Sequence, residues 1–202
     1  MANCDVIITQ DIQKNCTDPI TKGIEANGVI INRQDIDIDN VVYDSARKNI
    51  VKTLTIKTGK RAYRVFIPGT QPFNNTQTVL QAGTNRNTFT NDVGLVILDN
   101  DPDVCGNVID PLANGEFVVV YENKHKNINK TTTPGDSTFQ IVGLKQGLRA
   151  TTLENNKYSE DTDGGWNVLL QETGAPESAL FLYSVDLPTT RTLFNGLTAI
   201  TV

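Results

Sequence analysis

Two short apolar runs near the middle of the chain give the clearest structural signal in the sequence. They are residues 93–98 (VGLVIL) and 117–121 (FVVVY), and both are rich in β-branched or aromatic residues. Turn-forming residues follow the first run at 99–103, and Asn114-Gly115 precedes the second. Runs of this length are typical of strands buried on both faces rather than of helices. We therefore expect the two runs to form the centre of an all-β core, with other strands added on either side.

Alternating apolar and polar positions predict several more strands. Residues 50–57 and 61–67 alternate on either side of the turn Gly59-Lys60, which predicts a hairpin with a Lys- and Arg-rich face, either solvated or in contact with an acidic neighbour. Further strands are expected at 6–9, 29–31, 137–142, 148–153, 166–171 and 179–183. Trp166, at a strand start, is expected to anchor the core rather than to form a ligand platform.

Helical signals are few. Residues 105–113 have room for one short helix at most, and 188–194 can form a second, which Pro188 begins and Asn195-Gly196 ends. The fold class expected is all-β, a β-sandwich or open β-barrel with long loops and at most one or two short helices. The expected organisation is an N-terminal arm at 1–28 and a single β domain at 29–202.

Two polar stretches interrupt the strand pattern and are expected to be long loops. Residues 68–91 are rich in Gln, Asn and Thr, which could pair laterally with a neighbouring subunit. Residues 124–136 include Lys124, His125, Lys126 and Lys130, and they form either a disordered tip or a basic contact loop. Loops of this length in a compact domain tend to be functional or disordered.

Composition and charge narrow the function classes. The chain has 202 residues and a formal net charge of −5, which disfavours a tight grip on nucleic acid phosphates but permits a path along which DNA slides. Cys4, Cys16 and Cys105 lie too far apart for a zinc motif, so we expect reduced thiols. There is no secretory signal pattern and no apolar run near the ~20 residues that a membrane helix needs.

The alternation at Asp35, Asp37 and Asp39 predicts a strand with three carboxylates on one face. We interpret it as a charged edge strand that discourages pairing, and a divalent-cation site is the alternative. Asp99, Asp101 and Asp103 superficially suggest a calcium loop. Pro102 and Val104 occupy positions that such a loop reserves for other residues, which favours an acidic turn between strands.

Catalytic signals are weak. The single histidine, His125, lies in a polar loop with no nucleophile motif beside it, and no phosphate-binding glycine motif occurs. Glu160, Asp161 and Asp163 could serve acid–base chemistry, but acidic loops are common. We therefore expect a protein that is not an enzyme and has no catalytic, cofactor-binding or metal-binding residues.

The order of several segments resembles a known group of viral proteins. These segments are a turn-rich arm at 15–19 (NCTDP), the strand 94–100 (GLVILDN), the segment 108–117 (VIDPLANGEF) and the late strands 165–170 and 178–183. Together they resemble structural tail proteins of crAss-like bacteriophages that infect Bacteroides. The resemblance extends over most of the chain without one diagnostic motif. It implies a tail-tube-like β-sandwich or barrel that forms a ring around the DNA channel below the portal.

On this resemblance, the partners expected are other copies of the chain in a sixfold or twelvefold ring, neighbouring tail rings or portal-proximal proteins, and passing DNA that is not bound specifically. No membrane partner is expected. The expected location is the virion tail, after assembly in the cytoplasm of the bacterial host. An alternative function is a β-sandwich carbohydrate-binding or adhesin module, which would require exposed aromatic residues on one sheet face. A hydrolase based on carboxylates is a third option.

Overall fold

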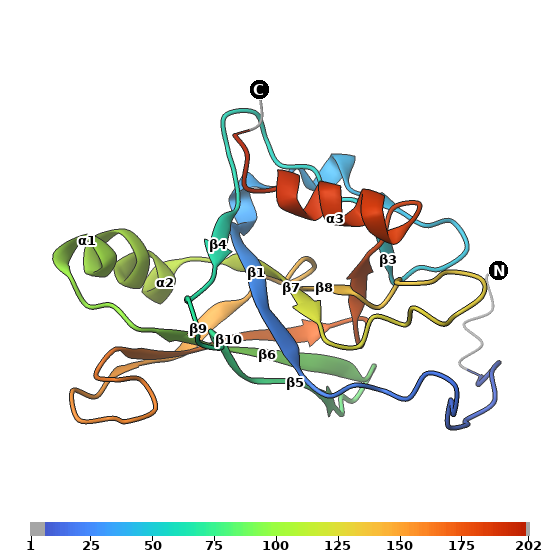
Figure 1. Cartoon of the computed structure of the whole chain (residues 1–202), viewed down its shortest axis with the longest axis horizontal. Coiled ribbons are helices and arrows are strands. Elements are labelled where there is room, and N and C mark those ends of the chain that lie inside the picture. Colours follow the sequence, from blue (N-terminus) through green and yellow to red (C-terminus); the bar gives the residue numbers. More distant parts are fainter. Residues whose placement is uncertain (1–6, 201–202) are drawn as a thin grey trace.

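The computed structural model describes residues 7–200 and contains two β-sheets packed face to face (Figure 1). The larger sheet has seven strands in the order β2-β3-β11-β8-β7-β1-β4, and the smaller has four in the order β5-β6-β10-β9. The predicted all-β sandwich is confirmed. The strands of the larger sheet are β1 (Ile24–Asn32), β2 (Val42–Tyr43), β3 (Ile50–Thr53), β4 (Tyr63–Val65), β7 (Phe117–Asn123), β8 (Phe139–Val142) and β11 (Leu180–Leu182). Those of the smaller sheet are β5 (Phe73–Gln81), β6 (Thr88–Ile97), β9 (Arg149–Asn155) and β10 (Trp166–Ala175).

Two helical segments lie outside the sheets. The first is continuous from α1 (Pro102–Val104) through the π-helix η3 (Cys105–Ile109) to α2 (Asp110–Asn114), and it begins where Asp101 accepts a hydrogen bond from the Val104 backbone N–H. The second is α3 (Leu187–Gly196), which Asp186 caps in the same way and which has Pro188 in its first turn. Both lie where the sequence predicted short helices. Short 3-10 turns occur at η1 (Arg33–Asp35) and η2 (Ile38–Asn40).

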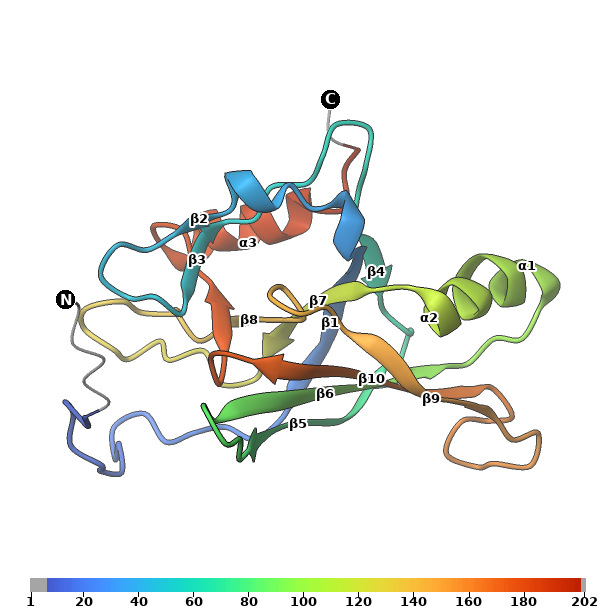
Figure 2. The same ribbon diagram turned by 180° about the vertical axis from the view of Figure 1, so that it is seen from behind.

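The larger sheet is buried on both faces, because α3 covers one side and the smaller sheet covers the other (Figures 1 and 2). Strand β7 shows this most clearly. Val118 and Val120 pack toward α3, whereas Val119 and Tyr121 pack toward the smaller sheet. A strand covered on both sides has no polar alternation, which explains its continuous apolar sequence. On the α3 side, the rings of Phe139 and Phe194 stack with centroids 4.5 Å apart.

The two central apolar strands lie in different sheets. The first is β6 of the smaller sheet, and the second is β7 of the larger sheet. Each is an inner strand, and the two face one another across the apolar layer between the sheets, where Val93 and Leu95 belong to the same core as Val119. The prediction that both runs are buried strands at the centre of the core is therefore confirmed, and the two strands belong to different sheets.

The hairpin predicted from 50–57 and 61–67 does not form. Strand β3 pairs with β2 and, in parallel, with β11, whereas β4 pairs with β1 at the opposite edge of the larger sheet. The turn at Gly59-Lys60 is present, with a hydrogen bond from the Lys60 N–H to the Lys57 carbonyl. The chain leaves the sheet there instead of folding back, since Leu54, Ile56 and Ala62 pack into the core beside α3.

Two other expectations need correction in the first part of the chain. Residues 68–91 were expected to be a long loop, but most of them form β5 and the start of β6, which pair as an antiparallel hairpin. The expected arm at 1–28 overlaps β1, which begins at Ile24 and places Gly28 opposite Tyr121. The strand expected at 6–9 lies partly outside the described residues, and residues 7–9 form no strand.

The prediction of a strand with three aligned aspartates is also wrong. Residues 33–40 form the 3-10 turns η1 and η2, so the three carboxylates do not share a strand face. Asp35 is buried and accepts a hydrogen bond from Asn32, while Asp37 accepts one from Asn40. Ile36 is buried but Ile38 is exposed. The alternating sequence therefore belongs to two turns on either side of a single buried residue, Ile36, and not to a strand.

Candidate functional site

The two sheets differ in their edge strands. The larger sheet ends in β2 and β4, which have two and three residues. The smaller sheet ends in β5 and β9, which have nine and seven residues, and each pairs with one neighbouring strand within the described chain. Most β5 residues are exposed. Since an edge strand presents unpaired N–H and C=O groups, the smaller sheet has two long edges to which a further strand can add.

The outer face of the smaller sheet, turned away from the larger sheet, carries a row of amide side chains. Gln77 and Gln171 each donate a hydrogen bond of 2.8 Å from Nε2 to a different carboxylate oxygen of Asp92. Asn74 Nδ2 donates to Asn167 Oδ1 at 3.2 Å. We call these five residues the amide row. It links β5, β6 and β10 and leaves Asp92 buried beneath its two glutamine partners. The centre of this face is therefore polar without an exposed charge.

Gly94 makes part of the amide row possible. It lies in β6 opposite Asn74, and an added Cβ would overlap both the backbone and the side-chain oxygen of Asn74. Only glycine leaves the space through which Asn74 passes over β6 to reach Asn167 on β10.

A small polar pocket of about 160 Å³ lies at one end of this outer face, beneath the 156–165 loop. Its lining residues are Asn74, Glu154, Asn156, Ser159, Asp161, Thr162 and Asn167. Thr162 Oγ1 is buried and has no hydrogen-bond partner among the described residues. Tyr158 lies in the same loop and is 95% exposed. The pocket therefore combines amide, hydroxyl and carboxylate groups, and the loop that covers it also carries an exposed aromatic ring.

Glu122 on β7 joins three elements through its carboxylate. Arg191 of α3 donates to both oxygens at 2.7 and 3.1 Å, and Lys126 and Asn27 donate at 2.9 Å each. Burial acts to raise the pKa of Glu122, but these hydrogen bonds outweigh it and lower the pKa to about 2. The charged carboxylate thus ties α3 and the 124–136 loop to the larger sheet.

Asp136 holds the other end of the 124–136 loop. It accepts hydrogen bonds from Asn127, Thr133 and Lys130 within the loop and from Arg47 outside it. Burial acts to raise the pKa of Asp136, and the bonds from Asn127, Thr133 and Lys130 bring it below its usual value. Lys130 pairs with Asp136 inside the loop, and Lys126 pairs with Glu25 on β1 and Glu122 on β7, which leaves the loop a weak basic contact surface.

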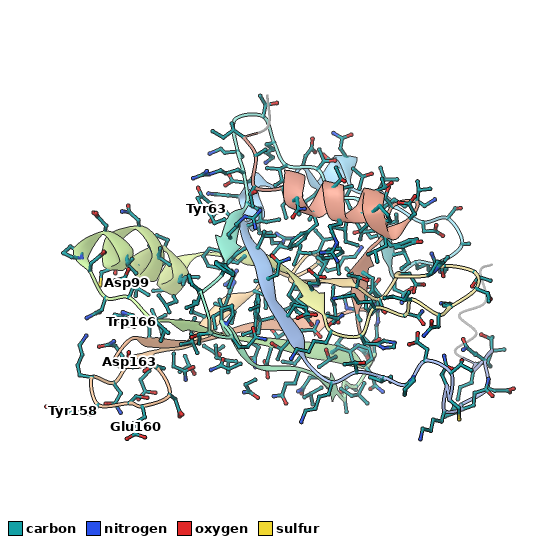
Figure 3. The ribbon with its side chains drawn as sticks, viewed as in Figure 1. Tyr63, Asp99, Tyr158, Glu160, Asp163 and Trp166 are labelled. Carbon is teal, nitrogen blue, oxygen red and sulfur yellow. The ribbon has the colours of Figure 1, made fainter. Side chains whose placement is uncertain are left out.

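Two of the acidic residues singled out in the sequence, Asp99 and Asp101, have local structural roles. Asp99 accepts hydrogen bonds from the backbone N–H groups of Asn100 and Asp101, and Asp101 caps α1. Figure 3 shows Tyr158 and Glu160 at the tip of the 156–165 loop. Within residues 7–200, no group of three or more His, Cys, Asp or Glu side chains is placed to hold a metal ion.

The remaining candidates are also placed by the structure. Trp166 is partly buried and packs at the margin of the core between the sheets (Figure 3). Its indole N–H donates a hydrogen bond of 3.0 Å to Asn100 Oδ1. The backbone carbonyl of His125 accepts a hydrogen bond from Ser137. Cys16 and Cys105 are free thiols, and Cys4 lies outside the described residues. No helix in the described part of the chain has the length and apolar character to cross a membrane.

Comparison of the chain with family models, with curated proteins and with solved structures found no match. The arguments about function therefore rest on the site geometry and the sequence.

Sequence reasoning missed the edge strand β5 and the amide row. A signal was present, because residues 76–81 (TQTVLQ) and 88–93 (TFTNDV) contain strand-forming residues on either side of a turn with Gly83. The polar side chains concealed it, since both outer edge and outer face of this sheet are solvated.

Proposed function

We propose that the chain is a structural subunit of a bacteriophage tail, and that copies join edge to edge in a closed ring around the DNA channel below the portal. One observation carries the proposal, namely that both edge strands of the smaller sheet, β5 and β9, are long and each pairs with one neighbouring strand within the described residues. Monomeric β-proteins usually keep such edges short or covered. The larger sheet follows that rule, and the smaller sheet does not.

Strand directions support joining β5 of one copy to β9 of the next. The pairs β5-β6, β6-β10 and β10-β9 are all antiparallel, so β5 and β9 run in opposite directions. When copies are related by rotation about an axis close to the strand direction, β9 of one copy meets β5 of the next in antiparallel orientation. An antiparallel sheet of four strands can thus continue from copy to copy until the ring closes.

The outer face of the smaller sheet suits the lining of a DNA channel. The amide row offers neutral hydrogen-bonding groups, and its carboxylate, Asp92, is covered by glutamines. A channel lined in this way forms few salt links with phosphate, so DNA passes without being held. Under this proposal the subunit resides in the virion tail, contacts neighbouring tail rings or portal-proximal proteins and assembles in the host cytoplasm in sixfold or twelvefold symmetry.

The edge contact can be tested with lysine substitutions, because a lysine on an edge strand opposes pairing. Val79→Lys on β5 and Thr151→Lys on β9 are each expected to abolish rings in native mass spectrometry. Val185→Lys, at an exposed valine in the turn before α3, is the matched control and should leave rings intact. Each variant keeps one intact edge, so an equimolar mixture of the two should give heterodimers. Rings that persist in both variants, or homodimers of one variant, would contradict head-to-tail pairing.

Carbohydrate binding is a second candidate function, supported by the small polar pocket and the exposed ring of Tyr158. Amide and carboxylate groups can hydrogen-bond sugar hydroxyls, while an aromatic ring can pack against a sugar face. A glycan array separates the two proposals. Binding that is lost in Tyr158→Ala and in Asn167→Ala would favour the adhesin function, whereas an array without signal removes it.

A further inference from the structure

An open apolar groove of about 670 Å³ lies between the two sheets at the end where β4, the end of β6 and the α1–α2 segment meet. Its walls include Val65, Leu95, Ile97 and Val108. Phe66, at its rim, is 59% exposed. A groove of this volume with mainly apolar walls has room for the side chains of an extended segment from another chain.

One wall of the groove is an edge strand. Within the described chain, β4 pairs with β1 alone, which leaves its other side unpaired. Tyr63 on this strand is half exposed and also lines the groove (Figure 3). An extended peptide that pairs with such an edge places alternate side chains into an adjacent pocket.

The N-terminal segment 7–22 supplies apolar residues that have no place in their own subunit. Ile8 is 79% exposed and Ile12 is 91% exposed, and the segment forms no strand or helix. In an extended conformation Ile8, Gln10 and Ile12 point to one side, whereas Ile7 and Asp11 point to the other. The face that carries Ile8 and Ile12 thus offers two apolar side chains that can enter an apolar groove.

The segment and the groove lie at opposite ends of the molecule. Figures 1 and 2 show the N-terminal segment at one end of the longest axis and the α1–α2 segment, which borders the groove, at the other. The strands of the smaller sheet run along this same axis. Copies stacked end to end along the strand direction would bring the segment of one copy to the groove of the next. Fully extended, residues 7–22 reach roughly 50 Å, enough to bridge such a junction.

We infer that the N-terminal segment of one copy adds as a strand to β4 of a second copy stacked on it and places Ile8 and Ile12 in the groove. This contact rests on the proposed ring and differs from the edge contact that closes it. Pairing between β5 and β9 joins copies around one ring, whereas segment exchange joins copies of successive rings. It also explains why residues 7–9, which belong to a predicted strand, form no strand within a single subunit.

Disulfide cross-linking between two versions of the full chain tests this contact. Both versions carry serine in place of Cys4, Cys16 and Cys105. One version has Ile8→Cys, and the other, which carries a mass tag, has Phe66→Cys. The control version has Ile128→Cys, an exposed isoleucine in the 124–136 loop. After mixing and oxidation, the Ile8–Phe66 pair should give on the order of tenfold more mixed dimer than the Ile8–Ile128 pair, since docking raises the effective concentration of the thiols.

A second measurement separates failure of this inference from failure of the ring. Electron microscopy should show stacked rings for the unmodified chain and single rings for Ile8→Asp/Ile12→Asp, whereas Ile7→Asp on the opposite face should leave stacking unchanged. Single rings without an Ile8–Phe66 cross-link would overturn segment exchange and leave the ring intact. A cross-link that forms only within one chain carrying both cysteines would also overturn it. Absence of rings under all conditions would contradict both proposals.

Discussion

At the level of single residues, the stability of the structure depends on a few positions where a change in side-chain size or charge removes several contacts. Gly94 gives Asn74 its route across β6, and Glu122 gathers three donors from three parts of the chain. Neither role is visible in the sequence, because both depend on partners brought together by folding. Their consequences can be measured individually.

Replacing Gly94 with alanine should destabilise the fold by roughly 1–3 kcal/mol, because the added methyl overlaps Asn74. Denaturation in urea measures the change. Gly106→Ala is the matched control, since a Cβ at that helical position meets no other atom and alanine favours a helix by about 1 kcal/mol over glycine. Equal stability for the two variants would show that the route of Asn74 does not need glycine.

Acid should weaken the fold through Glu122. Its pKa is about 2 in the folded chain, against an ordinary value of 4.5, so its stabilising effect is complete above pH 4.5. As pH falls through the folded pKa, on the order of 3 kcal/mol is lost. Glu122→Gln should therefore be less stable at neutral pH and should show a flatter decline between pH 4.5 and 2. Glu160→Gln, at an exposed position, is the control. If the free energy of unfolding of Glu122→Gln fell with pH as steeply as that of Glu160→Gln, this role of Glu122 would be contradicted.

At the level of elements, the two sheets are held together by polar as well as apolar contacts. Glu172 on β10 is buried and accepts hydrogen bonds from the backbone N–H groups of Gly143 and Gln146, both at 3.0 Å, in the turn between β8 and β9. Asn91 on β6 donates to the same carboxylate at 2.9 Å. Glu172 thus fixes the turn between β8 and β9, through which the chain passes from the larger sheet to the smaller.

Glu172→Ala should cost about 3–5 kcal/mol, because it leaves several buried donors without an acceptor. Thermal unfolding measures the loss, and amide exchange should show faster exchange at Gly143 and Gln146 than in the unmodified chain. Glu177→Ala, on the segment that follows β10, is a control for loss of a nearby carboxylate. A loss below about 1 kcal/mol would mean that water replaces the carboxylate at little cost.

Elements with strong local patterns could be predicted from sequence, and those whose pairing depends on distant segments could not. Strands β8 to β11 and helix α3 were predicted because periodicity and turn residues mark them. Strand β3 pairs in parallel with β11, which lies far away in the chain, so local alternation wrongly suggested a hairpin with the segment that follows. Strand β5 was missed because most of its side chains are polar, and they include Asn74 and Gln77, which donate hydrogen bonds to an amide and to a carboxylate.

At the scale of the whole molecule, the features on which the two proposals depend lie on different parts of the surface. The edges of the smaller sheet face sideways, its outer face carries the amide row, and the groove and the N-terminal segment lie at opposite ends. Of these, the sequence indicated only that residues 68–91, which include β5, could pair laterally with a neighbouring subunit. The groove could not be foreseen, because β1, β4, β6 and α2 each contribute part of its wall.

Electron microscopy of the purified chain over a range of concentrations tests the ring most directly. The expected result is closed rings of one rotational symmetry, with β5 of each copy beside β9 of the next and the amide row facing the central opening. Particles that remain monomers at the highest concentration, or twofold dimers joined through like edges, would contradict the proposed assembly.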